Sequence, residues 1–123
     1  INDLCGFHMN KSPNIIYEVE DSIAIITINR PERKNALDSQ TLEILNKTMD
    51  IAEKDICIKA IIITGIGDTF SSGFDLKDQL EKSPKGKEWK RVLDLDFKTI
   101  MRFWHSPKPT IAAVRGACLA GAF

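Results

Sequence analysis

The sequence has little of what would place it in a specialised class of protein. Lysine plus arginine and aspartate plus glutamate both number 17, so the formal net charge is zero. A balanced charge gives no whole-chain basic surface for nucleic acid or for an anionic membrane. No apolar run approaches the roughly 20 residues that a membrane-spanning helix needs. We therefore expect neither a nucleic-acid partner nor a membrane partner.

Cysteine and histidine are also scarce. The three cysteines, Cys5, Cys57 and Cys118, are odd in number and far apart. This pattern argues against a disulfide framework and fits a reducing compartment, so we expect a cytoplasmic protein. The two histidines, His8 and His105, are isolated, and no zinc-type spacing occurs. We therefore expect no metal site.

The remaining composition is ordinary for one small globular domain. The chain has 123 residues, of which 43% are hydrophobic and 28% are charged. This length and composition suit a single domain with a modest core. His8 and Met9 form the pair that a common cloning site encodes, so residues 1–8 are interpreted as a tag or vector remnant. No signal-peptide pattern follows Met9.

The chain is organised around residues 60–76, which read AIIITGIGDTFSSGFDL. Residues 60–64 are mostly β-branched and are followed by glycines, which predicts a strand buried on both faces. The small, polar loop at residues 68–73 then leads into a helix-like segment. A helix that begins there offers free backbone N–H groups to a negative oxygen, although an ordinary strand–loop–helix connection fits equally well.

Two strands and a helix are expected before this stretch. Residues 15–19 and 23–29 are strand-like and are separated by three residues, which predicts a hairpin whose second strand is the more deeply buried. Asp38 or Ser39 is a suitable N-cap for a helix that runs to about Lys54. Its apolar stripe, expected to face the core, consists of Leu42, Leu45, Met49 and Ala52.

Two further helices are expected after the central loop. We predict a short helix at residues 74–80, a polar surface loop at 81–87 and a longer helix at 88–105. The longer helix carries an aromatic-rich stripe of Trp89, Leu93, Phe97, Ile100 and Trp104. Such a stripe is more often part of a core or an interface than a cofactor site.

The end of the chain repeats the pattern of strand, glycine-containing loop and helix start. Residues 110–114 predict a second short buried strand, and residues 120–122 look like the start of a buried, small-residue helix. If this strand and the one at 60–64 are parallel neighbours, both loops lie at one edge of the sheet. Two N–H groups then converge on one oxygen, which is the geometry of an oxyanion hole.

Three motifs resemble those of the enoyl-CoA hydratase/isomerase (crotonase) superfamily. They are RPERKNALD at 30–38, FSSGFDL at 70–76 and PKPTIAAVRGACLAGA at 107–122, in the family's order and with its spacing. The resemblance implies an α/β fold, the crotonase-like spiral of ββα units. It also implies that residues 9–123 are the N-terminal part of that domain, without its C-terminal half. Family members are usually homotrimers or hexamers.

The resemblance also implies the ligand and the site. The ligand would be an acyl-CoA, and no cofactor would be needed beyond the coenzyme A of the substrate. The backbone N–H groups of Phe74 and Gly121 would form the oxyanion hole that stabilises a thioester enolate. The substrate-binding residues would be Lys34, Ala36, Leu37, Ser71, Ser72, Gly73, Phe74, Asp75, Leu76, Leu119 and Gly121. Phe74 stands where many members have alanine, so its ring is expected to narrow the acyl pocket.

Charged residues near the motifs are open to more than one interpretation. Arg30, Arg33 and Lys34 would either contact the phosphates of coenzyme A or form a solvated basic turn. Asp75 would cap or brace its loop and take no part in the chemistry.

The acid and base of the reaction are not found among these residues. Hydratases of the family carry one acidic residue just after the small-residue run, which would be position 124, and another further along. Asp68, Asp75 and Asp78 are candidates by position only. We expect a hydratase or isomerase whose proton carriers lie outside this chain. A related thioester hydrolase and a non-catalytic module that binds CoA or a protein are the alternatives; zero net charge gives an RNA-associated homologue no support.

Overall fold

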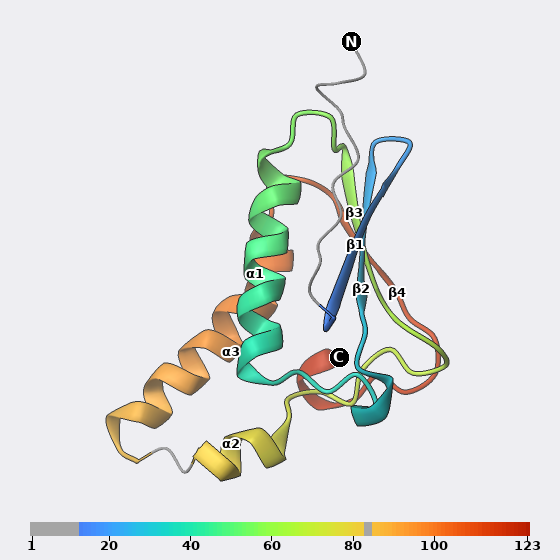
Figure 1. Ribbon diagram of the computed structural model, residues 1–123. Helices are drawn as coiled ribbons and strands as arrows, with labels where there is room; N and C mark the ends of the chain where they lie inside the picture. Colours follow the sequence, from blue (N-terminus) through green and yellow to red (C-terminus); the bar gives the residue numbers. More distant parts are fainter. Residues whose placement is uncertain (1–12, 83–84) are drawn as a thin grey trace.

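A four-stranded sheet forms the framework of the protein (Figure 1). The computed structural model describes residues 13–82 and 85–123. The strands lie in the order β1 (Ile15–Glu20), β2 (Ile23–Ile28), β3 (Ala60–Gly65) and β4 (Thr110–Ala113). β1 is antiparallel to β2, whereas β2, β3 and β4 are parallel. The last two strands are therefore parallel neighbours, which is the arrangement on which the predicted shared edge depends.

The hairpin between β1 and β2 is tighter than predicted. Glu20 pairs directly with Ile23, so the turn has two residues, Asp21 and Ser22, and not three. Both have positive φ angles, 48° and 67°, which match the right-handed twist of the strands in a two-residue hairpin. β2 lies between two strands and is more buried than β1, which confirms the predicted difference.

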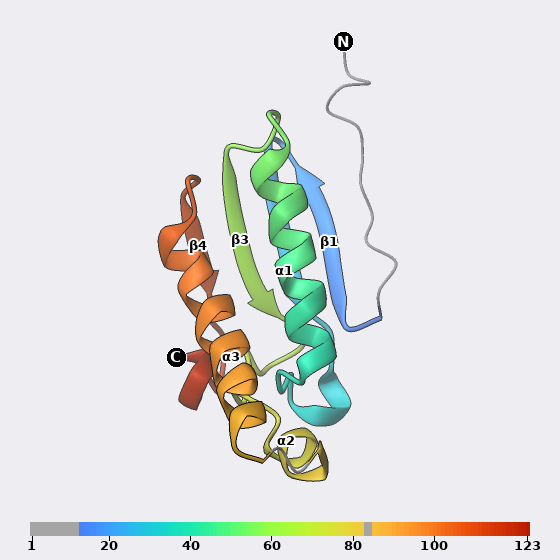
Figure 2. The same cartoon turned by 90° about the vertical axis from the view of Figure 1, so that its left-hand side faces the viewer.

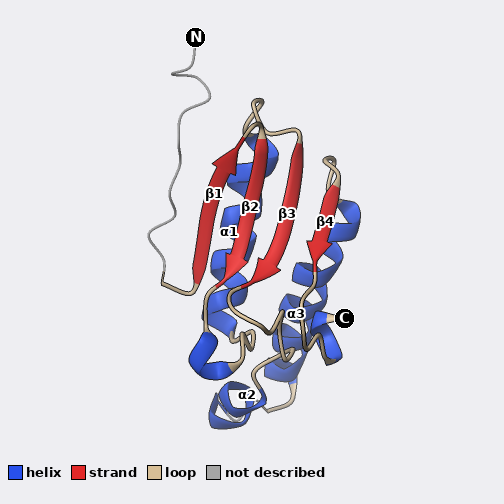
Figure 3. Cartoon of the chain, turned by 90° about the vertical axis from the view of Figure 1, so that its right-hand side faces the viewer, coloured by secondary structure: helices blue, strands red, loops and turns tan. Residues whose placement is uncertain are grey.

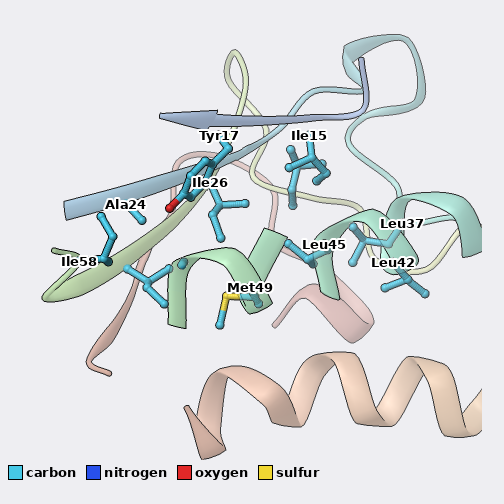
Figure 4. Close-up of a cluster of buried hydrophobic side chains, with 12 residues drawn as sticks. Ile15, Tyr17, Ala24, Ile26, Leu37, Leu42, Leu45, Met49 and Ile58 are labelled. Carbon is cyan, nitrogen blue, oxygen red and sulfur yellow. The ribbon is translucent and has the colours of Figure 1, made fainter. Parts of the chain in front are cut away.

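The first helix, α1 (Ser39–Lys54), matches its prediction closely. Asp38 is the N-cap, and its Oδ1 accepts a hydrogen bond of 2.8 Å from the Thr41 N–H. The predicted stripe is buried, and it packs on the side chains that β1 and β2 direct toward it (Figure 4). The fully buried cluster consists of Ile15, Tyr17, Ala24, Ile26, Ile28, Leu37, Leu42, Leu45, Met49, Ala52, Ile58 and Ile61.

Two more helices complete the fold: α2 (Leu76–Lys82) and α3 (Lys87–His105). α1 and α3 lie side by side over the same face of the sheet (Figure 2). Polar groups join them: Arg102 donates to the Asn46 carbonyl at 2.9 Å, and the Asn46 side chain donates to Thr99 Oγ1 at 2.7 Å.

The aromatic-rich stripe of α3 is not in the core. Trp104 is 80% exposed and Phe97 is 68% exposed, and Leu93 and Trp89 are exposed as well. The inward face of α3 carries the buried residues Asp96 and Thr99, together with Leu95 and Phe103, which pack against the core cluster. Only Ile100 of the stripe is partly buried, and it lines an apolar cavity. The core interpretation is therefore wrong within the described residues, and the interface interpretation stays a prediction.

The strands are also less buried than predicted. The described helices cover one face of the sheet and leave the other open (Figure 3). Ile62 is only half-buried on the open side, and Ile111 of β4 is 53% exposed. The small-residue segment Ala120–Ala122 forms a 3₁₀ turn with no buried residue, and not a buried helix. The predicted burial is wrong here because no described element covers these residues.

Cysteine pairing differs from the sequence argument. Cys57 is disulfide-bonded and Cys118 is free, so the argument against a disulfide is wrong for Cys57. Within residues 13–82 and 85–123, no helix combines the length and apolar character needed to cross a membrane. The same residues contain no group of three metal-binding side chains placed to hold an ion. The interpretation of residues 1–8 falls outside the described residues.

Candidate active site

Three segments meet beyond the carboxyl ends of the parallel strands (Figure 3). They are residues 30–38 after β2, residues 68–76 after β3 and residues 115–123 after β4. Open sheets with parallel strands usually bind their ligands at this edge. The three quoted motifs therefore come together in one place.

The segment after β3 is held on one side by the segment after β2. The Leu37 N–H donates to the Gly73 carbonyl at 2.8 Å, and the Asp75 N–H donates to the Leu37 carbonyl at 2.9 Å. Successive backbone groups of an extended segment point in opposite directions. The N–H of Phe74 therefore points away from Leu37.

The segment after β4 lies on the opposite side. The Ser71 N–H donates to the Ala117 carbonyl and the Leu119 N–H donates to the Ser71 carbonyl, both at 3.1 Å. The backbones approach closely at Gly73, where an added Cβ would lie 2.8 Å from the Leu119 oxygen and 3.3 Å from the Gly121 nitrogen. The Gly121 N–H is therefore next to the residue that precedes Phe74.

The two backbone donors that the family resemblance singles out have no hydrogen-bond partner at this meeting point within the described part of the chain, and neither do the N–H groups of Phe70, Cys118 and Ala120 nearby. Among the described residues, the N–H groups of Phe74 and Gly121 make no hydrogen bond, whereas the neighbouring Gly73 and Asp75 both donate. Turns that each end in a free N–H group can bind a negative oxygen between them.

Glycine is required where the two turns touch. Gly116 has a φ of +67°, and a Cβ there would lie 1.8 Å from the Asp68 carbonyl oxygen. A Cβ on Gly121 would lie 2.3 Å from Cε2 of Phe74. A side chain at Gly116 would force the two backbones apart, whereas a side chain at Gly121 would displace the ring of Phe74.

Asn35 ties two of the segments together, and the sequence analysis did not identify it as a site residue. It is buried with a φ of 55°, which asparagine tolerates better than most residues. Its Oδ1 accepts from the Arg30 N–H at 2.9 Å, and its Nδ2 donates to the carbonyls of Ile66 (3.1 Å) and Thr69 (2.7 Å). An asparagine a few residues after Pro31 was a turn signal that sequence reasoning could have used.

Ser71 extends this bracing to the central loop. Its side chain is fully buried. The Oγ donates to the Asn35 carbonyl at 2.7 Å and accepts from the Gly73 N–H at 3.1 Å. Ser71 therefore fixes the loop just before Phe74.

A buried ion-pair network supports the same loop. Asp75 accepts from Arg33 at 3.0 Å, from Arg30 at 3.4 Å and from the Asp78 N–H of α2 at 3.1 Å. Arg30 also pairs with Asp38 at 3.3 Å. Burial raises the pKa of Asp75, but the Asp78 N–H and the two arginines outweigh it, so the net shift is downward. Asp75 therefore braces its loop as a carboxylate, as the resemblance implied.

Two hollows flank the meeting point. A surface groove of about 420 Å³ contains many of the predicted binding residues: Lys34, Ala36, Ser72, Phe74, Asp75 and Leu76. An apolar cavity of about 250 Å³ lies between the sheet, α3 and the last turn. Its lining includes the predicted residues Leu37, Ser71 and Gly121, together with Ile63, Ile100 and Phe103. Gly73 and Leu119 line neither hollow and contact each other.

Comparison with known families decides the relationship of the chain. The family model described as enoyl-CoA hydratase/isomerase matches residues 18–123. The chain belongs to the enoyl-CoA hydratase/isomerase family. The resemblance seen in the three motifs is thereby confirmed.

Individual members of the hydratase/isomerase family agree with this assignment. The chain is 37% identical over 109 residues to the short-chain-enoyl-CoA hydratase of Clostridium acetobutylicum, covering 88% of this chain and 41% of that protein. It is 40% identical over 104 residues to a probable enoyl-CoA hydratase of Bacillus subtilis, covering 84% and 39%. The crystal structure of an enoyl-CoA hydratase/isomerase from Xanthobacter autotrophicus Py2 superposes with a TM-score of 0.87 and 58% identity, covering 89% and 41%.

These hydratase/isomerase relatives are longer than the chain. The chain spans about 40% of the length of the relatives and of the solved structure. The α/β fold of this portion agrees with theirs, which confirms the predicted fold class as part of a crotonase-like domain.

The basic residues of the first hydratase/isomerase motif have different environments. Arg30 is buried and paired with two carboxylates, so neither the phosphate contact nor the solvated turn describes it. Arg33 is partly exposed and pairs with Asp75. Lys34 is exposed and lines the groove, which makes it the best placed of the three for a phosphate.

The aspartates considered as proton carriers are poorly suited to that role. Asp75 is held by two arginines, and Asp78 accepts from the N–H and the hydroxyl of Ser39 at 3.3 and 3.0 Å. Asp68 is exposed. None of the three is a partly buried, unpaired carboxyl group of the kind that general acid–base catalysis requires.

Proposed function

We propose that the protein is an acyl-CoA enzyme of the enoyl-CoA hydratase/isomerase type. The thioester oxygen binds between the N–H groups of Phe74 and Gly121, where charge develops as an enolate forms. Backbone donors fixed in place before the reaction stabilise such charge without having to reorganise. Coenzyme A lies in the groove beside Lys34, and the acyl chain enters the apolar cavity.

One observation carries this proposal: the N–H groups of Phe74 and Gly121 lie in neighbouring turns. The backbone of each turn is fixed by hydrogen bonds of other residues, and these two N–H groups take no part in them. Ser71 and Leu37 fix the backbone on either side of Phe74. The glycine contacts leave no room for a side chain between the turns.

The same site supports an alternative that differs in its chemistry. Asp75 and Asp78 are already paired, and Asp68 is exposed, so none of these residues is well placed for proton transfer, and the described part of the site offers charge stabilisation by backbone N–H groups alone. Without acidic residues elsewhere in the full-length protein, the site would be a non-catalytic module that binds CoA or a protein. With differently placed acids it would isomerise an enoyl-CoA or hydrolyse a thioester.

Replacing the backbone amide of Gly121 with an ester, by incorporating glycolic acid at that position of the full-length protein, tests the proposal, because it removes the N–H group without adding a side chain that would meet Phe74. The hydration of crotonyl-CoA is measured as the loss of the absorbance of its conjugated double bond. The affinity for CoA is measured by calorimetry. We expect kcat to fall about 10²–10³-fold while CoA still binds. CoA binding without any turnover in the wild type supports the module, and absence of both contradicts the proposal.

Three related expectations belong to the same proposal. No cofactor is needed beyond the coenzyme A of the substrate, the assembly is a homotrimer or hexamer, and the location is cytoplasmic. The first two are predictions of the family relationship, whereas the third came from the cysteine pattern, against which the disulfide bond of Cys57 argues. Sedimentation of the full-length protein tests the assembly.

A further inference from the structure

The ring of Phe74 stands directly against the second proposed donor. Three ring atoms face Gly121: a Cβ added to that glycine would lie 2.3 Å from Cε2, 2.7 Å from Cδ2 and 2.8 Å from Cζ. The ring therefore packs on the glycine backbone, and a side chain at position 121 would have to displace it.

This contact forms the boundary between the two hollows. Phe74 lines the groove of about 420 Å³ that has charged side chains at its rim, including Lys34. Gly121 lines the apolar cavity of about 250 Å³ together with Ile63 and Phe103. Because the ring contacts the glycine, a molecule that occupies both hollows there lies beside the ring.

The ring of Phe74 is held in position by the hydrophobic core and by the backbone of Leu37. Phe74 is partly buried and packs against the hydrophobic cluster of the core. Its backbone pairs with Leu37, whose hydrogen bonds fix the residues before and after it. A ring anchored in this way cannot move aside without disturbing the core packing.

We infer that Phe74 determines acyl specificity by excluding substituents on the carbon next to the thioester carbonyl. This inference rests on the proposed function, in which the carbonyl oxygen binds between the two N–H groups. The first carbon of the acyl chain then lies closest to the ring. A straight chain presents only hydrogens there, whereas a methyl branch needs space that the ring occupies.

The test compares two saturated thioesters, butanoyl-CoA and 2-methylbutanoyl-CoA, by calorimetry on the full-length protein. Neither requires turnover, so binding alone is measured. We expect the wild type to bind the straight chain at least about 10-fold more tightly, which is the usual discrimination for one methyl-sized group. Phe74→Ala should remove most of this difference by tightening binding of the branched thioester.

Two further variants make the result specific. Phe74→Leu keeps an apolar side chain in the core and should give an intermediate ratio of the two affinities. This variant replaces Phe74→Ala in the test if the alanine variant does not fold. Leu76→Ala changes a 69% exposed residue of the same groove and should affect both thioesters equally. Equal binding by the wild type, or an unchanged ratio in both Phe74 variants, overturns the inference. A wild type that binds neither thioester nor free CoA contradicts the proposed function instead.

Discussion

The two turns that supply the proposed donors are built in different ways. The turn after β3 contains buried Ser71 and Asp75, each with several hydrogen bonds or ion pairs to the chain around it. The turn after β4 is mostly exposed, and two backbone hydrogen bonds to Ser71 join it to the first. The first turn is therefore held by its own polar contacts, whereas the second is positioned against the first.

The two turns should therefore contribute differently: the first to the stability of the fold, and the second to the position of a donor in the site. Loss of a contact in the first turn leaves buried polar groups unpaired, which destabilises the whole protein. Displacement of the second turn exposes little that was buried, so it should affect mainly the geometry of the site. The predictions that follow are ordered from the largest effect to the smallest, and those at Asp75 and Gly116 test this separation directly.

Asp75→Asn should cause the largest loss of stability. The change leaves Arg33 and buried Arg30 without a charged partner in the first turn, which should lower the free energy of unfolding by about 3 kcal/mol. Urea denaturation of the full-length protein measures this loss. Glu81→Gln is the matched control, because its pair with Lys77 is exposed and 3.9 Å long, and it should cost less than about 1 kcal/mol. Equal effects would show that the first turn is not held by this network.

The effect of Asp75→Asn should also depend on pH. The pKa of Asp75 is lower in the folded than in the unfolded protein, because its hydrogen bonds and arginine partners outweigh burial. Ionised Asp75 therefore stabilises the fold above its unfolded pKa of about 4, and this stabilisation is lost as the pH falls through the folded value. The wild type and the variant should approach each other in stability at acid pH. A difference that stays constant would contradict this assignment.

Gly116→Ala should affect activity more than stability. Its Cβ would clash with the Asp68 carbonyl, so the exposed second turn should shift away and carry the Gly121 N–H with it. We expect crotonyl-CoA hydration to fall on the order of 10²-fold, as when one such donor is lost. Gly67→Ala is the control, since Gly67 also has a positive φ (75°) but no atom within 4 Å of an added Cβ. Similar activities of the two variants would show that the second turn does not depend on contact with the first.

Asp96→Asn should have the smallest effect. Asp96 on α3 accepts from Gln79 of α2 at 3.0 Å, and burial raises its pKa despite this hydrogen bond. A raised folded pKa means that stability falls as the pH rises through the titration, so the variant should be up to about 1 kcal/mol more stable at pH 7. The gain should vanish near pH 3, where both forms are neutral. Asp94→Asn, a change at an exposed residue of the same helix, is the control. A loss of stability of Asp96→Asn at pH 7 would contradict the prediction and would show that the ionised carboxylate of Asp96 stabilises the fold.

The sequence predicted those features that depend on neighbouring residues. The N-cap at Asp38, the α1 stripe and both parallel strands follow from local patterns, and the structure contains all of them. The sequence alone could not predict which apolar faces of the helices and strands are covered by other elements. The spacing of Trp89, Phe97 and Trp104 shows that they share a face, but only the three-dimensional arrangement shows that α3 turns the other face toward α1.

The site was predicted to a similar extent. The parallel pairing of β3 and β4 and the meeting of their loops could be anticipated from the repeated pattern. The pairing of Arg30 with Asp75 could not, because the two are 45 residues apart and share no periodic element. Asn35 was missed for a related reason, since its three hydrogen bonds reach two separate loops.

The position of the core along the chain has a consequence for synthesis. Every residue of the fully buried cluster lies between residues 15 and 61. A ribosome therefore makes this whole cluster before it adds the loop at 68–76, which brings Phe70 and Phe74 onto the core, or the turn at 115–123. Domains generally fold from the amino end as they are made. The ββαβ unit is then in place as a template when each turn emerges, so the turn after β4 assembles on a surface that already exists.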